Sequence, residues 1–178
     1  MAAFDNKNDY LKSLNMKADI CSINNLMFNE VHEFMNNRNT FNLTTKKIST
    51  SILNNPNIIN LYGKFHDKVE NFGIVSVISC YQKGMGLHIN SWFMNANMIN
   101  FEMGFAIFDE IIIKSKNLGL KKIFAEYTPQ ENNKLCLDFL NNLGFKLLDD
   151  DENGDKYFIL DIPSYEYKNK FIEVIKHD

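Results

Sequence analysis

Apolar residues recur along this chain with two different periods, and the two periods alternate between residues 16 and 162. Stretches with a period of two, or with clustered β-branched and aromatic residues, predict strands. They cover 16–23, 58–66, 72–81, 86–96, 121–127, 146–150 and 156–162. Apolar residues spaced by three or four positions predict helices. These cover 24–37, 49–53, 98–118 and 132–143, with a further helix expected over 166–175.

Turn residues separate the predicted segments. Gly119 and Gly144 follow two of the predicted helices, and glycine commonly ends a helix. An Asn-Gly turn at 153–154 joins the last two strands into a hairpin. The polar, β-branched stretch 39–47 predicts an extended loop or a short strand end.

The order of these elements is β-α-(α)-β-β-β-α-β-α-β-β. Three consecutive meander strands followed by two strand–helix units predict an α/β domain. Its twisted sheet is mixed and mostly antiparallel, with helices on both faces. No internal repeat or linker divides the chain, and 178 residues suit a single domain over 1–178.

Composition and charge exclude several classes of function. The net charge is −3, and the lysine pairs at 46–47 and 121–122 stand isolated, so nucleic acid is not an expected partner. No apolar run reaches the roughly 18 residues of a membrane span, and the polar segment 5–9 is not a signal peptide. We therefore expect no membrane association.

Cysteine and histidine usage indicates neither a disulfide framework nor a metal site. Cys21, Cys80 and Cys136 are odd in number and widely separated. The four histidines show no ligand spacing either. The sequence therefore predicts a protein without a metal cofactor, in a reducing cytoplasm.

Four stretches carry a resemblance to a known family. They read NTFNLTTKK (39–47), NSWFMNAN (90–97), AEYTPQENN (125–133) and DFLNNLGF (138–145). Together they resemble the C-terminal GNAT-like (N-acetyltransferase-like) domain of FkbH-like proteins. In that family the domain follows a phosphatase-like domain of the haloacid dehalogenase (HAD) type. The resemblance spans about residues 9–162, and FNLTT (41–45) is its most specific part.

The resemblance implies a GNAT fold in which the fourth strand of the family's sheet splays from the fifth. The pantetheine arm of an acyl-CoA, or of a phosphopantetheine thioester, bonds to the exposed edge of that fourth strand as an added strand would. Here the matching backbone belongs to five successive residues. They are Trp92, Phe93, Met94, Asn95 and Ala96.

The resemblance also implies a pyrophosphate site at the following turn, where backbone N–H groups open a helix. The residues Asn97, Asn100, Met103 and Gly104 belong to this turn. Relatives carry an arginine and two glycines there, whereas this chain has Asn97, Asn100 and Glu102. Two interpretations stay open: a phosphate turn, or an ordinary helix start capped by Asn100.

The helix after the family's fifth strand departs from its relatives as well. A tyrosine that protonates the leaving thiolate in many GNAT enzymes would fall at Leu140. Cys136, one turn earlier, either replaces it or is simply a core residue. Asn133 matches the asparagine that caps this helix near the cofactor in relatives.

Three residues are candidates for the chemistry. Glu126, at a strand terminus, acts as a base or holds a hydroxyl or amine; alternatively it forms an ion pair with a neighbouring lysine. Asn42 and Thr44 either bind a small polyhydroxylated acyl group or bond the local backbone of their loop.

Two residues of the family's fourth strand have further predicted roles. Trp92 is expected to lie half in the core and half on the wall of the cleft. Asn95 either bonds an acyl carbonyl or faces solvent.

Three hypotheses of function follow. The first is an acyltransferase-like domain that handles an acyl thioester, with a glyceryl or methoxymalonyl-type unit loaded onto a carrier. Its implied partners are an acyl carrier protein or a HAD-type phosphatase-like domain, together with a small-molecule acyl substrate. The second is a degenerate GNAT-fold module that docks such a partner without chemistry. The third is an ordinary small-molecule N-acetyltransferase.

Overall fold

The computed structural model describes residues 6–38 and 40–177, and of residues 99–101 only the backbone. Its strands form one sheet in the order β7-β8-β6-β5-β4-β3-β1-β9, with β2 paired to β5 beside this path. The strands are β1 (Lys17–Ser22), β2 (Thr40–Asn42), β3 (Ile58–His66), β4 (Asn71–Lys83), β5 (Gly86–Asn95), β6 (Lys122–Tyr127), β7 (Lys146–Asp150), β8 (Lys156–Asp161) and β9 (Glu173–Ile175).

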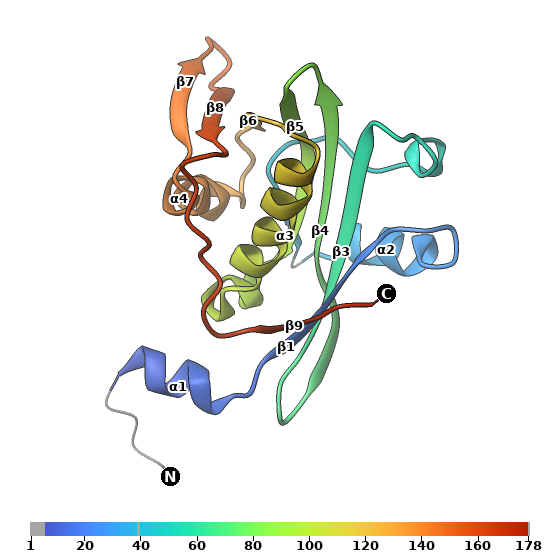
Figure 1. Cartoon of the computed structure of the whole chain (residues 1–178), viewed down its shortest axis with the longest axis vertical. Coiled ribbons are helices and arrows are strands. Elements are labelled where there is room, and N and C mark those ends of the chain that lie inside the picture. The colour runs from blue at the N-terminus through green and yellow to red at the C-terminus, as the bar shows by residue number, and fades with distance from the viewer. Residues whose placement is uncertain (1–5, 39, 178) are drawn as a thin grey trace.

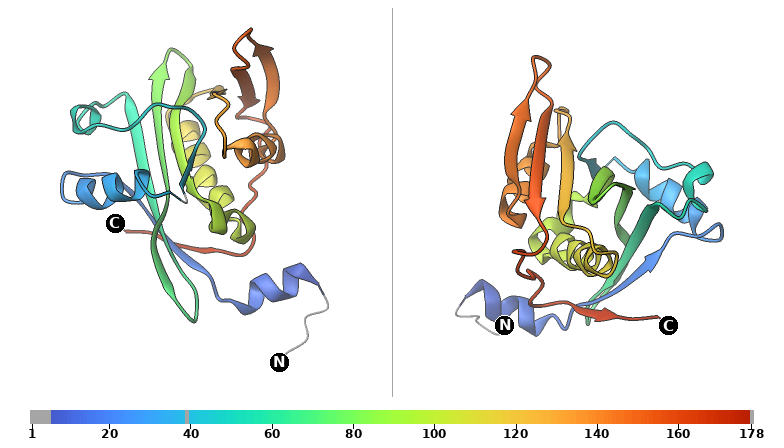
Figure 2. Two further views of the ribbon diagram at one scale, coloured as in Figure 1. Left: turned by 180° about the vertical axis from the view of Figure 1, so that it is seen from behind. Right: turned by 45° about the horizontal axis from the view of Figure 1, so that its top comes forward.

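Helices lie on both faces of the sheet, as Figures 1 and 2 show. They are α1 (Lys7–Ser13), α2 (Phe28–Met35), α3 (Met103–Asn117) and α4 (Lys134–Leu143), with short 3₁₀ turns η1 (Thr50–Ile52) and η2 (Ala96–Phe101). The largest core cluster joins α3 and α4 to one face, and Phe108, Leu140 and Ile78 belong to it. A second cluster joins α2 to the other face through Val31 and Val77. The sheet is therefore the middle layer of three.

Strands β5 and β6 run parallel but pair only at their first residues. Their register joins Gly86–Ile89 to Lys122–Ala125. β5 continues to Asn95, still paired with β4 as far as Met94, while β6 turns away. The two strands therefore part, as the resemblance implies, and an opening follows beyond Ile89.

The predicted strands and their order are confirmed, with boundaries shifted by one or two residues. The helix predicted over 98–118 begins only at Met103, because the left-handed Glu102 (φ 65°) separates it from η2. Helix α1 was not predicted; it is a short amphipathic turn whose Leu11 is buried.

The prediction of a helix over 166–175 is wrong. This segment contains no helix and ends as β9, which pairs parallel with β1. Asp109 of α3 accepts hydrogen bonds from the backbone N–H groups of Lys168 and Asn169 and so holds this segment against α3. Among the described residues, no helix is long and apolar enough to cross a membrane.

Candidate functional site

The opening between β5 and β6 is filled by the chain itself. Residues 40–46, called the strap below, cross it: their first three residues form β2, and the chain bends over the next three. β2 pairs antiparallel with β5, joining Thr40 to Asn95 and Asn42 to Phe93. The next residue, Leu43, donates its N–H to the carbonyl of Trp92 (3.3 Å) and is fully buried. The strap thus occupies the strand edge expected to be exposed for a pantetheine arm, and that expectation is corrected.

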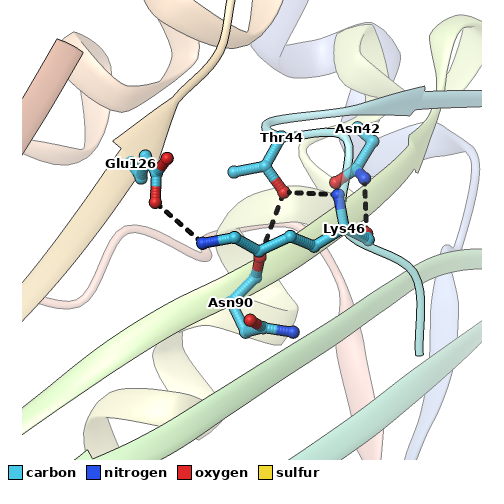
Figure 3. Close-up of polar contacts among 5 residues, drawn as sticks. All are labelled: Asn42, Thr44, Lys46, Asn90 and Glu126. Carbon is cyan, nitrogen blue, oxygen red and sulfur yellow. Dashed lines mark hydrogen bonds and ion pairs between the residues drawn. The ribbon is translucent and has the colours of Figure 1, made fainter. Parts of the chain in front are cut away.

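Asn42 and Thr44 bond the backbone around them. The amide oxygen of Asn42 accepts the N–H of Trp92 (3.1 Å), and its amide nitrogen donates to the carbonyl of Lys46 (2.9 Å). The Thr44 hydroxyl donates to the carbonyl of Asn90 (3.0 Å) and accepts the N–H of Lys46 (3.2 Å), as Figure 3 shows. Asn42 and Thr44 were expected either to bind an acyl group or to bond the backbone of their loop, and these contacts agree with the second interpretation.

Asn133 is the main holder of the strap. Its amide nitrogen donates to the carbonyls of Asn42 and Thr128 (both 2.9 Å). Its oxygen accepts the hydroxyl of Tyr127 (3.0 Å) and the N–H of Gln130 (2.8 Å). It stands at the N-cap of α4, as predicted, but its side chain makes no capping bond to the helix. All four bonding positions of this buried amide are used outside the helix.

Two more contacts fasten the strap from the α4 side. Gln130 donates its side-chain amide to the carbonyl of Thr44 (3.0 Å), and Thr128 donates its N–H to the carbonyl of Leu43 (2.8 Å). The sequence analysis missed Gln130. The only signal was its place in the string AEYTPQENN, where it stands three residues before Asn133.

Glu126 lies at the mouth of the opening, near the strap. Its carboxylate is 2.9 Å from the ammonium of Lys46, and the two side chains are 28% and 51% exposed (Figure 3). The ion pair with a lysine, one of the two predicted interpretations, is therefore present. Glu126, Asn42 and Thr44 lie in one corner of the molecule, with Lys46 joining them.

Trp92 is entirely buried, so its predicted position half on a cleft wall is wrong. Its indole N–H donates to the hydroxyl of Ser76 (3.1 Å), and its ring stacks on Phe108 and meets Phe139 edge-on. Alternation along β5 directs the tryptophan to the α3 side, where aromatic rings surround it.

The other residues of the expected thioester edge are also engaged or enclosed. Phe93 and Met94 are buried. Asn95 is half-buried, and its side-chain oxygen accepts the N–H of Asn97 (2.9 Å) rather than facing solvent free. Ala96 begins η2 and is half-buried.

The start of α3 departs from an anion-binding turn in two ways. Glu102 takes the N-cap position in a left-handed conformation and makes no side-chain capping bond. Burial raises the pKa of its carboxyl, while Lys7 and Lys170 act in the opposite direction. The predicted cap Asn100 has a side chain outside the described residues. Asn97 is exposed at the beginning of this turn.

Met103 and Gly104 are buried at the first turn of α3. A Cβ at Gly104 would lie 2.4 Å from the ring of Phe139, so this glycine allows α3 to approach α4 closely. The same close packing leaves a cavity of only about 10 Å³ between Ser76, Met94 and Met103. That is room for about one water molecule. A pantetheine arm does not fit here in this conformation.

No acid is placed for proton transfer at helix α4. Leu140 has no ionisable group, and Cys136, the candidate substitute, is fully buried. Burial raises the pKa of the Cys136 thiol to about 12, which is typical of an inert core cysteine. Within the described ranges, no three His, Cys, Asp or Glu side chains gather so that they could hold a metal ion.

Comparison with known proteins identifies the fold. No protein-family model matches the chain, and no curated protein matches it. A GNAT-family acetyltransferase from Staphylococcus aureus is similar over 82% of this chain and 99% of its own, with 16% identity and a TM-score of 0.58.

Two further structures agree. A putative streptothricin acetyltransferase from Bacillus anthracis, solved with acetyl coenzyme A, covers 82% of this chain and 98% of its own (14% identity, TM-score 0.62). The ribosomal-protein-S18-alanine N-acetyltransferase of Escherichia coli covers 86% and 99% (11% identity, TM-score 0.59). At these identities the likeness shows the fold, which is the GNAT fold.

Proposed function

We propose that this chain is an acyltransferase-type domain that binds an acyl thioester along the edge of β5, in a state in which the strap has moved away. One observation carries the proposal: β5 accepts a strand at this edge, and the strand it accepts is only the three residues Thr40–Asn42. A pantetheine arm adds to such an edge through the same backbone groups. The fold is shared with acetyltransferases whose structures hold acetyl coenzyme A or coenzyme A.

The strap sets the cost of this binding. Moving it exposes Leu43, worth about 2 kcal/mol, and breaks several hydrogen bonds of about 1 kcal/mol each. A thioester arm on β5 restores the bonds to that strand, whereas those from Gln130 and Asn133 to the strap are lost. The apparent affinity for the thioester is the affinity of the open state multiplied by the fraction of molecules in that state.

Glu126 supplies the contact proposed for the reacting end of a small acyl unit, such as a glyceryl unit carried by an acyl carrier protein. Asn42 and Thr44 leave this corner with the strap, so their amide and hydroxyl groups stabilise the closed state. Glu126 is free to hold an acceptor hydroxyl or amine once Lys46 leaves with the strap. The compartment proposed for this activity is the cytoplasm.

A second candidate is a GNAT-fold module that docks a carrier protein or a HAD-type partner without chemistry. The specific observation in its favour is the lack of a placed acid: Leu140 stands where relatives carry a tyrosine, and the candidate substitute Cys136 is fully buried. The filled opening also favours it, because a module needs no substrate channel.

The test is binding of acetyl coenzyme A and of S-acetyl-pantetheine to the native chain and to Gln130→Ala, measured by calorimetry. Gln130→Ala removes the side-chain bonds to the carbonyls of Thr44 and Asn42 but leaves β5 untouched. We expect it to bind thioester about fivefold more tightly, because about 1 kcal/mol less holds the strap closed. Asn132→Ala, an exposed neighbour, is the matched control and should change nothing.

Turnover separates the two candidates. Acyl transfer that is lost in Glu126→Gln supports the enzyme, and binding without turnover supports the module. If no thioester binds to the native chain or to Gln130→Ala, at millimolar concentrations, the proposal is wrong.

A further inference from the structure

A pocket of about 320 Å³ opens between the end of α4, the end of β8 and residues 162–172, called the tail below, which follow β8. It is lined by Leu143, Leu160, Tyr165, Lys122, Lys146 and Lys168, among others. Its volume reaches the lower range of small-ligand sites. Lys122 begins β6 and Glu126 nears its end, so the pocket and the strap lie toward opposite ends of that strand.

The floor of this pocket is apolar. Leu143 and Leu160 are buried beneath it, and the ring of Tyr165 forms part of one side. Such a floor favours a ligand with an apolar body, because water on it gains few hydrogen bonds.

The rim of the pocket carries an excess of positive charge. Lys122, Lys146 and Lys168 line it, against the carboxylates of Asp161 and Glu166. Asp161 is engaged by Lys122 at 2.7 Å. The ammonium of Lys168 lies 5.9 Å from the centre of the Tyr165 ring, which holds it beside the pocket. Three ammonium groups against two carboxylates leave one net positive charge around the hollow, and with Lys122 paired to Asp161 the field that attracts an anion comes mainly from Lys146 and Lys168.

A simpler role for these lysines is capping of the α4 C-terminus, which the helix dipole would favour. The structure already supplies backbone partners there. Gly144 donates its N–H to the carbonyl of Asn141, and Phe145 donates to that of Leu140. The helix end therefore has its own C-cap, with the left-handed Gly144 that this motif uses. Capping does not account for three lysines.

The outer wall of the pocket is held in place before any ligand arrives. Asp109, a buried carboxylate of α3, accepts the hydroxyl of Tyr165 (2.8 Å) and the N–H groups of Lys168 (3.1 Å) and Asn169 (2.9 Å). At the start of the same segment, Ser164 donates its N–H to the carboxylate of Asp161 (3.2 Å). A preformed wall lowers the entropy lost on binding.

We propose that this pocket binds a small organic anion with an apolar body, its charged group among Lys122, Lys146 and Lys168 and its body on Leu143 and Leu160. A carboxylate and a phosphate monoester share this chemistry. This site shares no residue with the strap, so the proposal does not depend on the function proposed above and is tested separately.

The experiment titrates the whole chain with hexanoate, hexyl phosphate, inorganic phosphate and 1-hexanol, followed by amide chemical shifts. We expect saturable shifts at Gly144 and Ser164 with hexanoate or hexyl phosphate, and at least about fivefold weaker binding of hexanol, which lacks the charge. The stronger of the two anions identifies the charged group. Inorganic phosphate, which lacks the apolar body, should also bind more weakly.

Variants then test the rim. Lys146→Met and Lys168→Met should each weaken binding about fivefold, while Lys146→Arg keeps the charge and most of the affinity. Lys134→Met, an exposed lysine at the start of α4, is the matched control and should leave binding unchanged. The proposal is overturned if neither hexyl anion saturates the shifts by about 10 mM, which is weaker than small-molecule sites usually are. Equal binding of hexanol, or equal effects of Lys134→Met and Lys146→Met, would overturn it too.

Discussion

Two short segments lie against the core of this molecule, and one buried polar side chain makes several of the hydrogen bonds that hold each segment. Asn133 holds the strap, and Asp109 holds the tail (residues 162–172). The amide of Asn133 both donates and accepts, so it ties the strap to the loop before α4. The carboxylate of Asp109 only accepts, and gathers donors from the tail alone.

The difference shows in the space that each segment leaves. The strap adds a strand to β5 and leaves a cavity of about 10 Å³ nearby, whereas the tail leaves a pocket of about 320 Å³. A segment that pairs as a strand follows the spacing of its neighbour and excludes ligands. The tail does not pair as a strand over 162–172, so it does not follow the spacing of a neighbouring strand, and room for a pocket stays beside it. The same fold thus closes the expected site and opens another.

The largest expected effect on the two segments is that of Asp109→Ala, which tests whether this carboxylate anchors the tail. It leaves the Tyr165 hydroxyl and the N–H groups of Lys168 and Asn169 without their acceptor. Bonds to a charged group are worth about 1.5–3 kcal/mol each, and we expect a loss of about 3 kcal/mol in the free energy of unfolding by urea. Amide exchange should accelerate at Asn169 and not at Leu43. Glu110→Ala, the half-buried neighbour on α3, should cost less than about 1 kcal/mol. Equal losses of unfolding free energy in Asp109→Ala and Glu110→Ala would show that Asp109 does not anchor the tail.

Asn133→Ala should have a smaller effect, located at the other segment. It removes partners from the carbonyls of Asn42 and Thr128 and from the hydroxyl of Tyr127. Because these groups are neutral, we expect a loss of about 2 kcal/mol. Hydrogen exchange at Leu43 should accelerate while that at Asn169 stays unchanged. Asn142→Ala, an exposed asparagine on α4, is the control. Unchanged exchange at Leu43 would show that the strap does not depend on Asn133.

The smallest expected effect is a response of the tail to acid. Hydrogen bonds from Lys122 and Ser164 hold the pKa of Asp161 below its usual 3.8. The folded-state pKa is depressed, so the stabilisation is complete above pH 3.8 and is lost as the pH falls through the lower folded value. Carbon-detected titration should give Asp161 a midpoint below 3.8, and Asp161→Asn should remove this part of the acid sensitivity. A midpoint at or above 3.8 would contradict the contact with Lys122.

Much of the fold could be predicted from local pattern. The alternation over 58–66 and 86–96 and the spacing of Phe105, Phe108 and Ile112 specify strand and helix by themselves, because one face must be buried. The corner containing Asn42, Thr44 and Glu126 was also anticipated, through the resemblance of their strings. What those residues do there was not, since a polar side chain in a loop serves a ligand or its own backbone equally well on local grounds.

The sequence by itself determined the order of strands and helices, and its resemblance to GNAT-like domains implied the parting of β5 from β6 and showed the departures at Leu140 and Glu102. Only the tertiary structure decided that the strap pairs with β5, some 50 residues further along the chain, and that the tail runs extended instead of helical. The physical reason is the same in both cases. Each segment is too short to choose its conformation from its own side chains, and a buried hydrogen-bonding group on a distant element makes the choice.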